Sequence, residues 1–479
     1  MIRRGTLAGF LVLISACGGR TNGEIERPPE SYCVPGQQIL CACSHGSVGY
    51  QTCRSDLTYG SCMCQNTTSS GGSGNSSSGG RASGGAVGAG GFPTTGGAFG
   101  LGGAISSGGA PGAAGAAGKT PISFEAPDLS AEASQASNIG LNARHDNLQP
   151  ADVVRSPLAK VWTVDFGNKL SYPLVADGLV FALTMGAQPT LSAIDVDTGK
   201  MVWGPLSMGG RVTLAYDAHR IYTLNDSGML SARSTSDGAV LWTSQMREQS
   251  FFEPAPVAAN GKVYVNGSGF GGNTIAVNGE TGAVLWSSNT FDGSEGSVAA
   301  VPGGVILAEA CDQISYFSES TGQREWFYTN CTGGGGTTPG VYGTWLWVRD
   351  WAVANVIVDL HGNAHGNFAA KAMPAFFDGN VFYMSGGGIS AVAIASTKQL
   401  WSFMDAKHTL CSSPVVAGTG RQVFVASDDG TVLELSADTG KTLSSDAAGG
   451  SIQCGAEGAT LAIAQNHLFV PADKQLVAY

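Results

Sequence analysis

The segment AIDVDTGKMVW at Ala193–Trp203 recurs along the chain and decides its fold. Its copies are ARSTSDGAVLW at Ala232–Trp242, AVNGETGAVLW at Ala276–Trp286 and YFSESTGQREW at Tyr316–Trp326. The copies stand about forty residues apart, and at such a period each copy is one supersecondary unit that buries its apolar surface against its neighbours. The repeat therefore predicts a fold made of similar stacked units.

Each unit has the pattern of several short antiparallel strands. The segment GLVFALT at Gly178–Thr184 alternates and is rich in β-branched and aromatic residues, which favours a half-buried strand. The Thr-Gly or Asp-Gly pair that follows supplies the positive φ of a tight hairpin turn. The terminal Trp is large enough to fill the space between adjacent sheets. Four strands in about forty residues make one blade of a β-propeller, so we expect an all-β fold.

The strand before each turn counts the blades, because it persists in units that lack the Trp. It occurs eight times, at Val180, Ile221, Val263, Val305, Leu346, Val381, Val423 and Leu468. The sequence thus predicts an eight-bladed β-propeller with four-stranded blades over residues 158–479. The eighth unit ends at Gln475–Tyr479 without a Trp strand, and Ala159–Gly167 has the missing pattern. We expect this N-terminal strand to close the last blade and to remove an exposed sheet edge.

Two units depart from the repeat. The seventh carries Leu443 where the Trp is expected, and the fifth carries VIVDLHGNAH at Val356–His365 without a Thr-Gly turn or a Trp. We interpret the region of Asp359, His361 and His365 as a solvated loop that interrupts the repeat. A metal site is the alternative, but the His-x-x-x-His spacing brings two side chains together on a helix and not in this Gly/Asn-rich sequence.

The fifth unit also contains the best candidate for a partner surface, formed by Trp345, Trp347, Arg349 and Trp351. Trp and Arg are enriched at the energetic centres of protein interfaces. The alternative is core packing, because Trp345 and Trp347 alternate onto one side of a strand.

The N-terminal region has the features of an exported lipoprotein. Residues 1–16 place two arginines before a short apolar run and small residues, which indicates a secretory signal. Cys17 follows directly, and the arrangement resembles the bacterial lipobox, which implies lipidation of Cys17 and, with Gly18 after it, the outer membrane. A plain signal peptide with a coincidental cysteine is the alternative. Residues 17–30 would then form a tether.

Residues 31–65 form a second predicted unit, rich in cysteine. In an exported protein, six cysteines in so short a segment indicate a disulfide-stapled module whose pairing the sequence leaves open. These are Cys33, Cys41, Cys43, Cys53, Cys62 and Cys64. A zinc site is the alternative, although the pairs are C-x-C and not C-x-x-C. Residues 66–119 are mostly Gly, Ser, Ala and Thr, which predicts a flexible linker, and residues 120–157 form a lead segment expected to pack on the ring only in part.

Four cysteines lie within the ring. Cys331, Cys411 and Cys454 precede innermost strands, and Cys311 ends a second strand, so all four are expected on the same face of the ring. We expect the disulfides Cys311–Cys331 and Cys411–Cys454, with a reactive thiol as the alternative.

The charge of the chain limits its partners. The sequence has 36 acidic and 25 basic residues, a net charge of -11, and no cluster of Lys and Arg. Nucleic acid and anionic lipid are therefore not expected partners, and any contact with the membrane is expected through the lipid anchor alone.

The repeat resembles a known family. Ala193, Asp195, Thr198, Gly199 and Trp203 follow the pattern A-x-D-x-x-T-G-x-x-x-W of pyrroloquinoline-quinone-type propellers. The run GLNARHDNLQPADVVRSPLAKVWTVDF, residues 140–166, also resembles the entry segment of that group. The group includes quinoprotein dehydrogenases and non-catalytic scaffolds, among them the propeller lipoprotein of the outer-membrane β-barrel assembly machinery. The resemblance therefore implies the fold and leaves the chemistry open.

The catalytic branch of that family would have two adjacent cysteines at the quinone, an Asp base and acidic calcium ligands. No two cysteines are adjacent here, and the recurring acids lie beside hairpin turns that account for them: Asp195, Asp197, Asp237 and Asp438. We therefore expect no catalytic residue, no cofactor and no metal. The predicted function is binding of a protein or glycan partner at the cell envelope; the alternatives are a quinoprotein-like oxidoreductase and a carbohydrate-binding surface protein.

Overall fold

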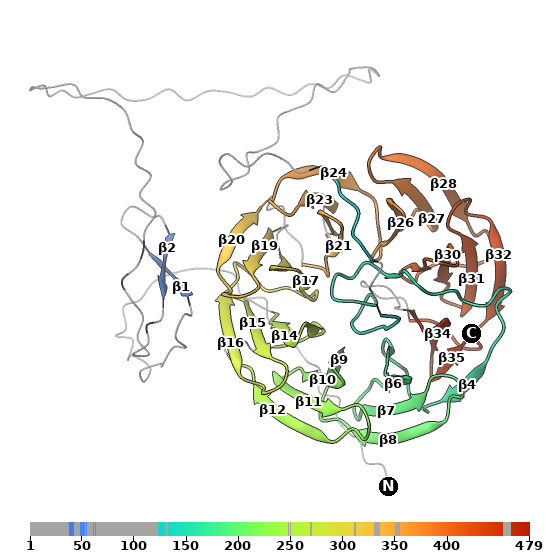
Figure 1. The fold of residues 1–479 in the computed structure, drawn as a ribbon, viewed down its shortest axis with the longest axis horizontal. Coiled ribbons are helices and arrows are strands. Elements are labelled where there is room, and N and C mark those ends of the chain that lie inside the picture. Colours follow the sequence, from blue (N-terminus) through green and yellow to red (C-terminus); the bar gives the residue numbers. More distant parts are fainter. Residues whose placement is uncertain are drawn as a thin grey trace, which may run out of the picture.

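The ring is the main part of the protein, and Figure 1 shows it along its axis in a computed structural model. The structure describes residues 38–42, 48–52, 54, 61, 63, 123–129, 133–247, 249, 251–268, 271–310, 313–329, 336–349, 355–453 and 461–479. The predicted lipidation site Cys17 lies outside these residues, as do Cys33, Cys43, Cys53, Cys62 and Cys64. Within the Cys-rich region, β1 (Gln38–Ala42, which includes Cys41) pairs antiparallel with β2 (Val48–Thr52).

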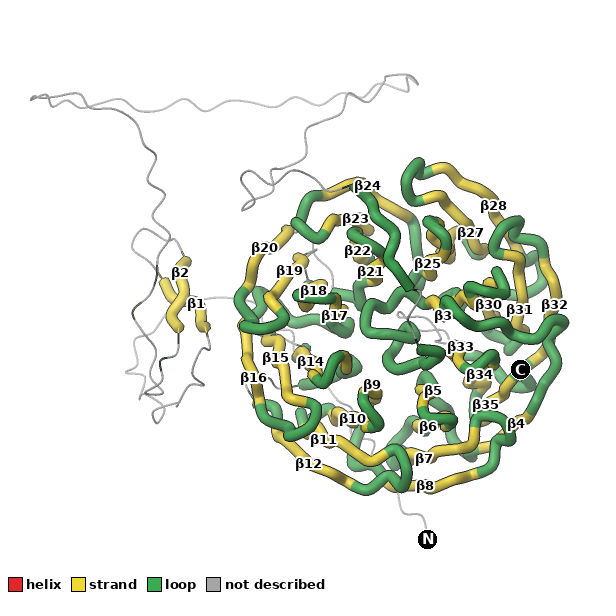
Figure 2. Tube along the Cα trace, viewed as in Figure 1, coloured by secondary structure: helices red, strands yellow, loops and turns green. Residues whose placement is uncertain are grey.

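Eight blades of four antiparallel strands form the ring, which confirms the predicted eight-bladed β-propeller (Figure 2). Blade 1 contains β5 (Leu174–Ala176), β6 (Leu179–Leu183), β7 (Thr190–Asp195) and β8 (Met201–Ser207). Blade 2 contains β9 (Val212–Asp217), β10 (Arg220–Asn225), β11 (Met229–Ser234) and β12 (Val240–Gln245). Blade 3 contains β13 (Val257–Ala259), β14 (Lys262–Asn266), β15 (Asn273–Asn278) and β16 (Val284–Asn289). Blade 4 contains β17 (Ala299–Val301), β18 (Gly304–Glu309), β19 (Gln313–Ser318) and β20 (Arg324–Tyr328).

In the second half of the ring, as in the first, the strands of each blade are given from the axis to the rim. Blade 5 contains β21 (Gly340–Tyr342), β22 (Trp345–Val348), β23 (Asn355–Asp359) and β24 (Ala364–Phe368). Blade 6 contains β25 (Ala375–Phe377), β26 (Asn380–Ser385), β27 (Gly388–Ala393) and β28 (Lys398–Met404). Blade 7 contains β29 (Val415–Ala417), β30 (Gln422–Ala426), β31 (Thr431–Ser436) and β32 (Thr442–Ala447). Blade 8 contains β33 (Ala462–Ala464), β34 (His467–Ala472), β35 (Gln475–Ala478) and β4 (Trp162–Asp165).

The ring is closed by its N-terminal strand, as the sequence predicts. Strand β4 pairs antiparallel with β35, so that Trp162 lies opposite Ala478 and Asp165 lies opposite Gln475. Figure 1 places β4 at the rim beside the C-terminal strand, although the two are about three hundred residues apart in sequence. The closing pair removes the free edge of blade 8.

The repeated Trp residues connect neighbouring blades. Each indole N–H donates to a backbone carbonyl in the next blade at 2.7–3.1 Å, and each ring lies against the turn glycine of that blade. The six pairs of donor and acceptor residues are Trp162–Val196, Trp203–Thr235, Trp242–Gly279, Trp286–Glu319, Trp326–Leu360 and Trp401–Ala437. The Thr-Gly turn and the Trp are thus two halves of one inter-blade contact.

Gly282 shows why this turn requires glycine. Its φ is 75°, in the left-handed region, and a Cβ at this position would lie 2.6 Å from the ring of Trp242. Any side chain would therefore be strained in the backbone and would displace the indole.

The structure corrects the position of the missing Trp in blade 7. Counting from the turn, Ser444 lies opposite Glu434 in the register that pairs Trp203 with Ala193. Leu443, the position predicted from the sequence, is instead exposed at the rim. In blade 5, Gly366 lies opposite Ile357 in the same register.

The structure also corrects the interpretation of the fifth unit as a loop. Residues 355–368 form the paired strands β23 and β24, and Asp359 is fully buried at the end of β23. The turn between them is held by Asp359, which accepts hydrogen bonds from the backbone N–H groups of His361 (2.8 Å) and Asn363 (3.0 Å). An Asp-centred turn thus replaces the Thr-Gly turn, which is why the repeat pattern fails while the blade persists.

The lead segment is far more integrated than the sequence suggests. Residues 133–152, which we call the plug, run through the centre of the ring, where Figures 1 and 2 show them crossing the axis. Residues 138–141 and 145–149 are all buried, and β3 (Leu148–Gln149) pairs parallel with β29. The expectation that this segment packs only in part on the ring is wrong for these residues.

The plug bonds to every blade. At the axis, blades 1 to 7 each donate at least one backbone N–H to it; the bonds at 2.7–3.1 Å come from Val175, Tyr216, Ala258, Ala300, Val341, Phe376 and Val416. In blade 8 the backbone N–H of Asn466 donates to the carboxylate of Asp152. Inner edges that would otherwise expose unpaired backbone groups are satisfied by one continuous segment.

After the plug, the chain crosses the junction between blades 7 and 8, where blade 7 has Ser444 in place of the Trp. Val154 and Leu158 are buried between blades 7 and 8, and the backbone of Val154 exchanges two hydrogen bonds with Gln422 (3.0 and 2.7 Å). The fully buried carboxylate of Glu434 accepts from Gln422 (2.8 Å) and from Ser444. The exit segment and a satisfied polar network therefore occupy the place of an indole.

Candidate functional site

The aromatic residues predicted as a partner surface lie mostly inside blade 5. Trp347 is 1% exposed and contacts Phe376 of blade 6 (ring centroids 4.7 Å apart), and Arg349 is 5% exposed. Trp345 is half-buried, and Trp351 lies outside the described residues. The buried positions of Trp347 and Arg349 agree with the alternative of core packing and make these two side chains inaccessible to a partner.

Among the described residues of this cluster, the half-buried Trp345 is contacted by the segment 123–129. Phe124 contacts Tyr342 (centroids 6.0 Å apart) and Trp345 (5.5 Å). The backbone of Glu125 accepts from Thr344 N–H at 3.2 Å and donates to the Thr344 hydroxyl at 3.0 Å. The aromatic surface of blade 5 therefore docks the segment 123–129.

The acidic and histidine side chains of blade 5 form a structural cluster. His365 Nε2 lies 2.9 Å from Asp359 Oδ2, and the His365 ring stacks on Trp345 (centroids 4.6 Å apart). Burial favours a higher pKa for Asp359, but hydrogen bonds from His365, Asn363 and the turn backbone outweigh it and hold this pKa below its usual value. Among the described residues, no group of three or more His, Cys, Asp or Glu side chains could hold a metal ion.

The acids beside hairpin turns have the roles predicted for them in two cases. Asp195 accepts from the backbone N–H and the hydroxyl of Thr198 (2.9 and 2.6 Å), and these bonds lower its pKa. Asp237 accepts from the backbone of Ala239 at 3.1 Å. Asp438 differs, because it pairs with Arg421 (2.6 Å).

The structure describes one of the four cysteines predicted to form the ring disulfides. Cys411 is disulfide-bonded, whereas Cys311, Cys331 and Cys454 lie outside the described residues. The pairings Cys311–Cys331 and Cys411–Cys454 therefore stay predictions.

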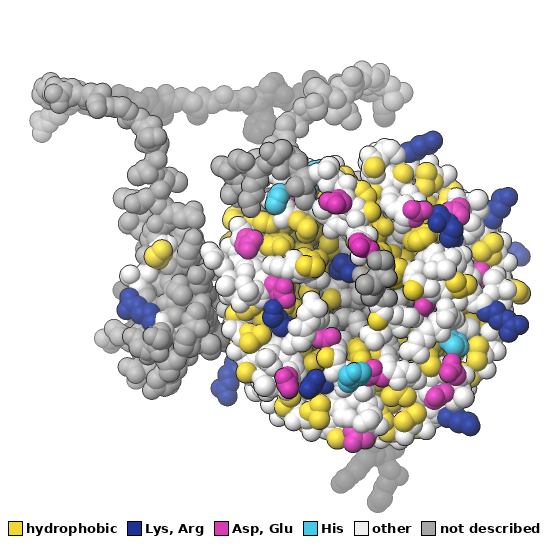
Figure 3. Space-filling view, in the orientation of Figure 1, with side chains coloured by type: hydrophobic (Ala, Val, Ile, Leu, Met, Phe, Trp, Pro, Cys, Tyr) yellow, Lys and Arg dark blue, Asp and Glu magenta, His cyan; other side chains and the backbone are white. Residues whose placement is uncertain are grey.

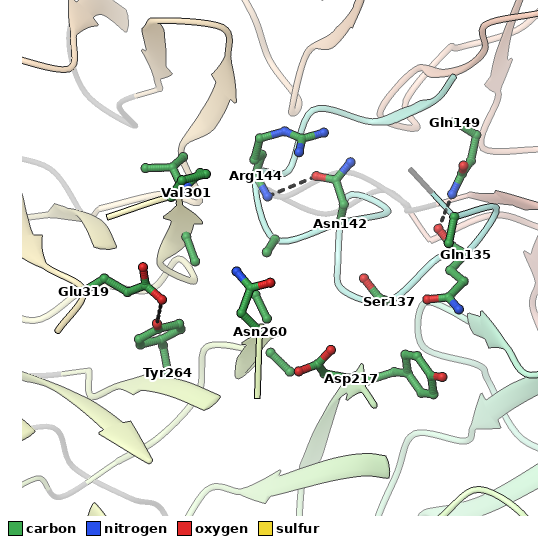
Figure 4. Close-up of a pocket in the computed structure, with 17 residues that line it drawn as sticks. Gln135, Ser137, Asn142, Arg144, Gln149, Asp217, Asn260, Tyr264, Val301 and Glu319 are labelled. Atoms are coloured by element: carbon green, nitrogen blue, oxygen red, sulfur yellow. Dashed lines mark hydrogen bonds between the residues drawn. The ribbon is translucent and has the colours of Figure 1, made fainter. Parts of the chain in front are cut away.

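A pocket beside the plug is the main candidate binding site that the sequence did not predict. It has a volume of about 370 Å³ and lies between the plug and the inner strands and turns of blades 2, 3 and 4. Figure 4 shows Asn142 and Arg144 of the plug on one side, and Asp217, Asn260 and Glu319 on the other. The only sequence signal near it is the polar run that begins at Gly140.

Ion pairs neutralise most charges around this pocket. Arg144 pairs with the buried carboxylate of Asp146 (2.7 Å), and Lys262 pairs with Glu319 (2.8 Å). The hydrogen bond from Lys262 is the main cause that lowers the pKa of Glu319. Burial raises the pKa of Tyr264, whose hydroxyl donates to Glu319 at 3.3 Å. The pocket is therefore polar with little net charge.

The surface around the pocket has mixed charge. On the face shown in Figure 3, Lys and Arg side chains lie singly, many of them near the rim, among acidic and hydrophobic side chains. On this face, the described basic side chains therefore form no continuous stripe.

A quinone cofactor on the ring axis does not fit the residues present. The plug occupies the axis, and it is bonded there to the innermost strands of seven blades. A planar cofactor at that position would have to displace buried backbone that already satisfies these strands. The Cys, Asp and calcium-ligand pattern of the catalytic branch is also not found in the sequence.

Aliphatic side chains are exposed along the rim. The residue before the Trp position is 46–52% exposed in six blades, at Val161, Val202, Leu241, Leu285, Leu400 and Leu443. Blades 1 to 3 expose a second aliphatic residue beside it, and we call these six side chains the rim patch: Met201, Val202, Val240, Leu241, Val284 and Leu285. Blades 4 and 5 carry Glu325 and His365 at the equivalent position.

Closed blades, Trp contacts between them and an axis crossed by the plug define a β-propeller of the pyrroloquinoline-quinone-repeat class. The sequence profile of the family described as outer membrane protein assembly factor BamB matches residues 159–328 and 341–479. The chain belongs to this family.

Individual relatives include an assembly factor and an alcohol dehydrogenase. The chain is 24% identical to outer membrane protein assembly factor BamB of Yersinia pestis over 259 residues, which cover 50% of the chain and 60% of that protein. It is 27% identical to the quinoprotein alcohol dehydrogenase PedH of Pseudomonas putida over 201 residues, 36% of the chain and 33% of that protein. The chain thus spans less than two thirds of these relatives.

Solved structures show the same fold. BamB from Moraxella catarrhalis superposes with a TM-score of 0.52 and 17% identity, covering 67% of this chain and 96% of that one. A europium-containing methanol dehydrogenase superposes with a TM-score of 0.58 and 14% identity, covering 71% and 90%. In the part of this chain that the structure describes, no helix has the length and apolar character needed to span a membrane.

Proposed function

We propose that the protein is a non-enzymatic scaffold of the cell envelope that binds protein partners. The observation that carries this proposal is the plug, because its backbone crosses the ring axis and bonds to the innermost strands, where a central cofactor would have to lie. Membership of the assembly-factor family supports the same function. Attachment through a lipid on Cys17, probed by mass spectrometry of the N-terminal peptide, belongs to this proposal.

The rim patch is the proposed surface for the partner. It lies on β8, β12 and β16, the outermost strands of three consecutive blades, and it has six aliphatic side chains that are 42–51% exposed. Exposed apolar side chains favour association, and outermost strands also present unpaired backbone groups that an extended partner segment can bind.

Crosslinking in the intact envelope tests this function. The variant Val202→Lys/Leu241→Lys places two charges in the rim patch, and Leu400→Lys/Leu443→Lys is the matched control at the same strand position on blades 6 and 7. We expect a specific crosslinked partner to disappear in the first variant and to persist in the control. A crosslink pattern that is identical in both variants and the native protein would refute the rim patch as the partner surface.

A further inference from the structure

We propose that the pocket between the plug and blades 2 to 4 binds a neutral, hydroxyl-rich ligand of the saccharide class. This inference goes beyond the scaffold function, because the pocket lies between the plug and blades 2 to 4, whereas the rim patch lies at the perimeter. It depends only on the lining of the pocket and on the rigidity of the plug.

Four amide side chains contribute to the polar lining of the pocket. Gln135, Asn142, Gln149 and Asn260 all face the pocket, as Figure 4 shows. An amide carries both donor N–H groups and an acceptor oxygen, which matches a sugar hydroxyl that donates and accepts at once. Gln149 is 3% exposed, and its buried Oε1 has no hydrogen-bond partner, so the wall has unused capacity for hydrogen bonds.

The charges of the lining favour a ligand without net charge. Arg144 and Glu319 are already paired with Asp146 and Lys262 at 2.7 and 2.8 Å. Asp217 accepts a hydrogen bond from the backbone of Gly261 at 2.6 Å and retains further acceptor sites on its two oxygens. A carboxylate with free acceptor sites suits hydroxyl donors, whereas an anionic ligand would meet Asp217 and Glu319 directly.

The same lining is unsuited to an anchoring side chain of a protein. The rings of Tyr216 and Tyr264 are 4% and 1% exposed, and their hydroxyls donate to Asp177 and Glu319. Small residues such as Ala258 and Ala300 supply much of the remaining wall. Interface hot spots instead bury large apolar or aromatic groups in deep pockets, so a small polar ligand fits better.

The plug holds its side of the pocket in place before any ligand arrives. Asn142 accepts from the backbone of Arg144 (3.0 Å) and donates to Asp146 (2.6 Å), which leaves it one N–H and one acceptor site. The carbonyl of Ala143 accepts from Ala300 of blade 4 at 2.8 Å. A wall that is already ordered reduces the entropy lost on binding.

Two substitutions remove polar groups without disturbing the backbone. Asn260→Gly deletes the amide at a turn residue with φ of 54°, a conformation that glycine adopts freely. Asp217→Asn removes the charge but keeps an oxygen for the Gly261 N–H. The matched control is Gln465→Gly, because Gln465 has φ of 52° at the equivalent turn position of blade 8 and does not line the pocket.

The test is calorimetry and ligand-observed NMR with the full chain and a panel of glucose, galactose, N-acetylglucosamine and their disaccharides. We expect saturable binding of at least one sugar, weakened about tenfold in Asn260→Gly and in Asp217→Asn and unchanged in Gln465→Gly. Absence of saturable binding to the whole panel would overturn the proposal, as would binding that the two pocket variants leave unchanged. Partner crosslinking at the rim should be the same in all three variants, so the two proposals can fail separately.

Discussion

The side chain of Asn138 pairs with the backbone of Ala258 as a neighbouring strand would. Its Oδ1 accepts from the Ala258 N–H at 2.8 Å, and its Nδ2 donates to the Ala258 carbonyl at 3.1 Å. Both residues are almost fully buried. One amide side chain thus satisfies the innermost strand of blade 3 at a point where the plug backbone does not reach it.

Replacing Asn138 with Leu should destabilise the ring strongly. The substitution keeps the volume but leaves the N–H and the carbonyl of Ala258 buried without partners, at a cost of about 1–3 kcal/mol for each group. Urea denaturation should show a lower midpoint with an unchanged slope. A midpoint equal to that of the native protein would contradict the bridging role of Asn138.

Replacing Gly282 with Ala tests two contributions of the inter-blade turn to the free energy of unfolding: the left-handed backbone conformation and the contact with Trp242. Gly261 is the matched control, because its φ is 74° and a Cβ added there would have nothing within 4 Å, whereas Gly282 faces Trp242. Gly261→Ala should cost about 1–2 kcal/mol for the left-handed backbone alone. Gly282→Ala should cost about 1–3 kcal/mol more, from displacement of the indole. Equal losses of unfolding free energy would rule out the Trp contact as a source of stability.

The buried Asp359 should make the ring sensitive to acid. Its pKa in the folded state lies below the value of 3.8 expected for an unfolded chain, so folding favours the ionised form. Its contribution to stability is therefore complete above about pH 4 and is lost as the pH falls further. The variant Asp359→Asn should unfold with a shallower loss of stability between about pH 4 and pH 2 than the native protein. Identical pH profiles in urea denaturation would argue against this assignment.

The ring cysteines should be oxidised in the exported protein. Peptide mapping without reductant should recover Cys311 linked to Cys331 and Cys411 linked to Cys454. For Cys311–Cys331 the closed loop of about 20 residues corresponds to about 3 kcal/mol in the chain-entropy model. Four alkylatable ring thiols in the unreduced protein would exclude both bonds.

The periodic part of the fold could be predicted and the non-periodic part could not. Blade number and closure follow from a repeat that recurs at a fixed register, and Trp162 opposite Ala478 continues that register across the chain ends. The plug has no period, and it turns at non-glycine residues with positive φ, among them Leu141, His145 and Asn147. Such turns lack the Gly and Pro signals by which loops are recognised in a sequence.

The candidate site, too, could be predicted only in part from the sequence. Alternation placed Trp345 and Trp347 on one side of a strand, but alternation alone does not say whether that side faces solvent or the next blade. The pocket joins residues as distant in sequence as Asn142 and Glu319, and only the closed ring brings them together.

We propose that the plug leaves the ring without a binding site for a quinone cofactor. Titration of the purified full chain with pyrroloquinoline quinone and calcium, followed by absorbance and calorimetry, measures whether the quinone binds. We expect no stoichiometric binding and no change in thermal stability at any ratio of quinone to protein. Tight binding of one quinone per chain would refute the proposal.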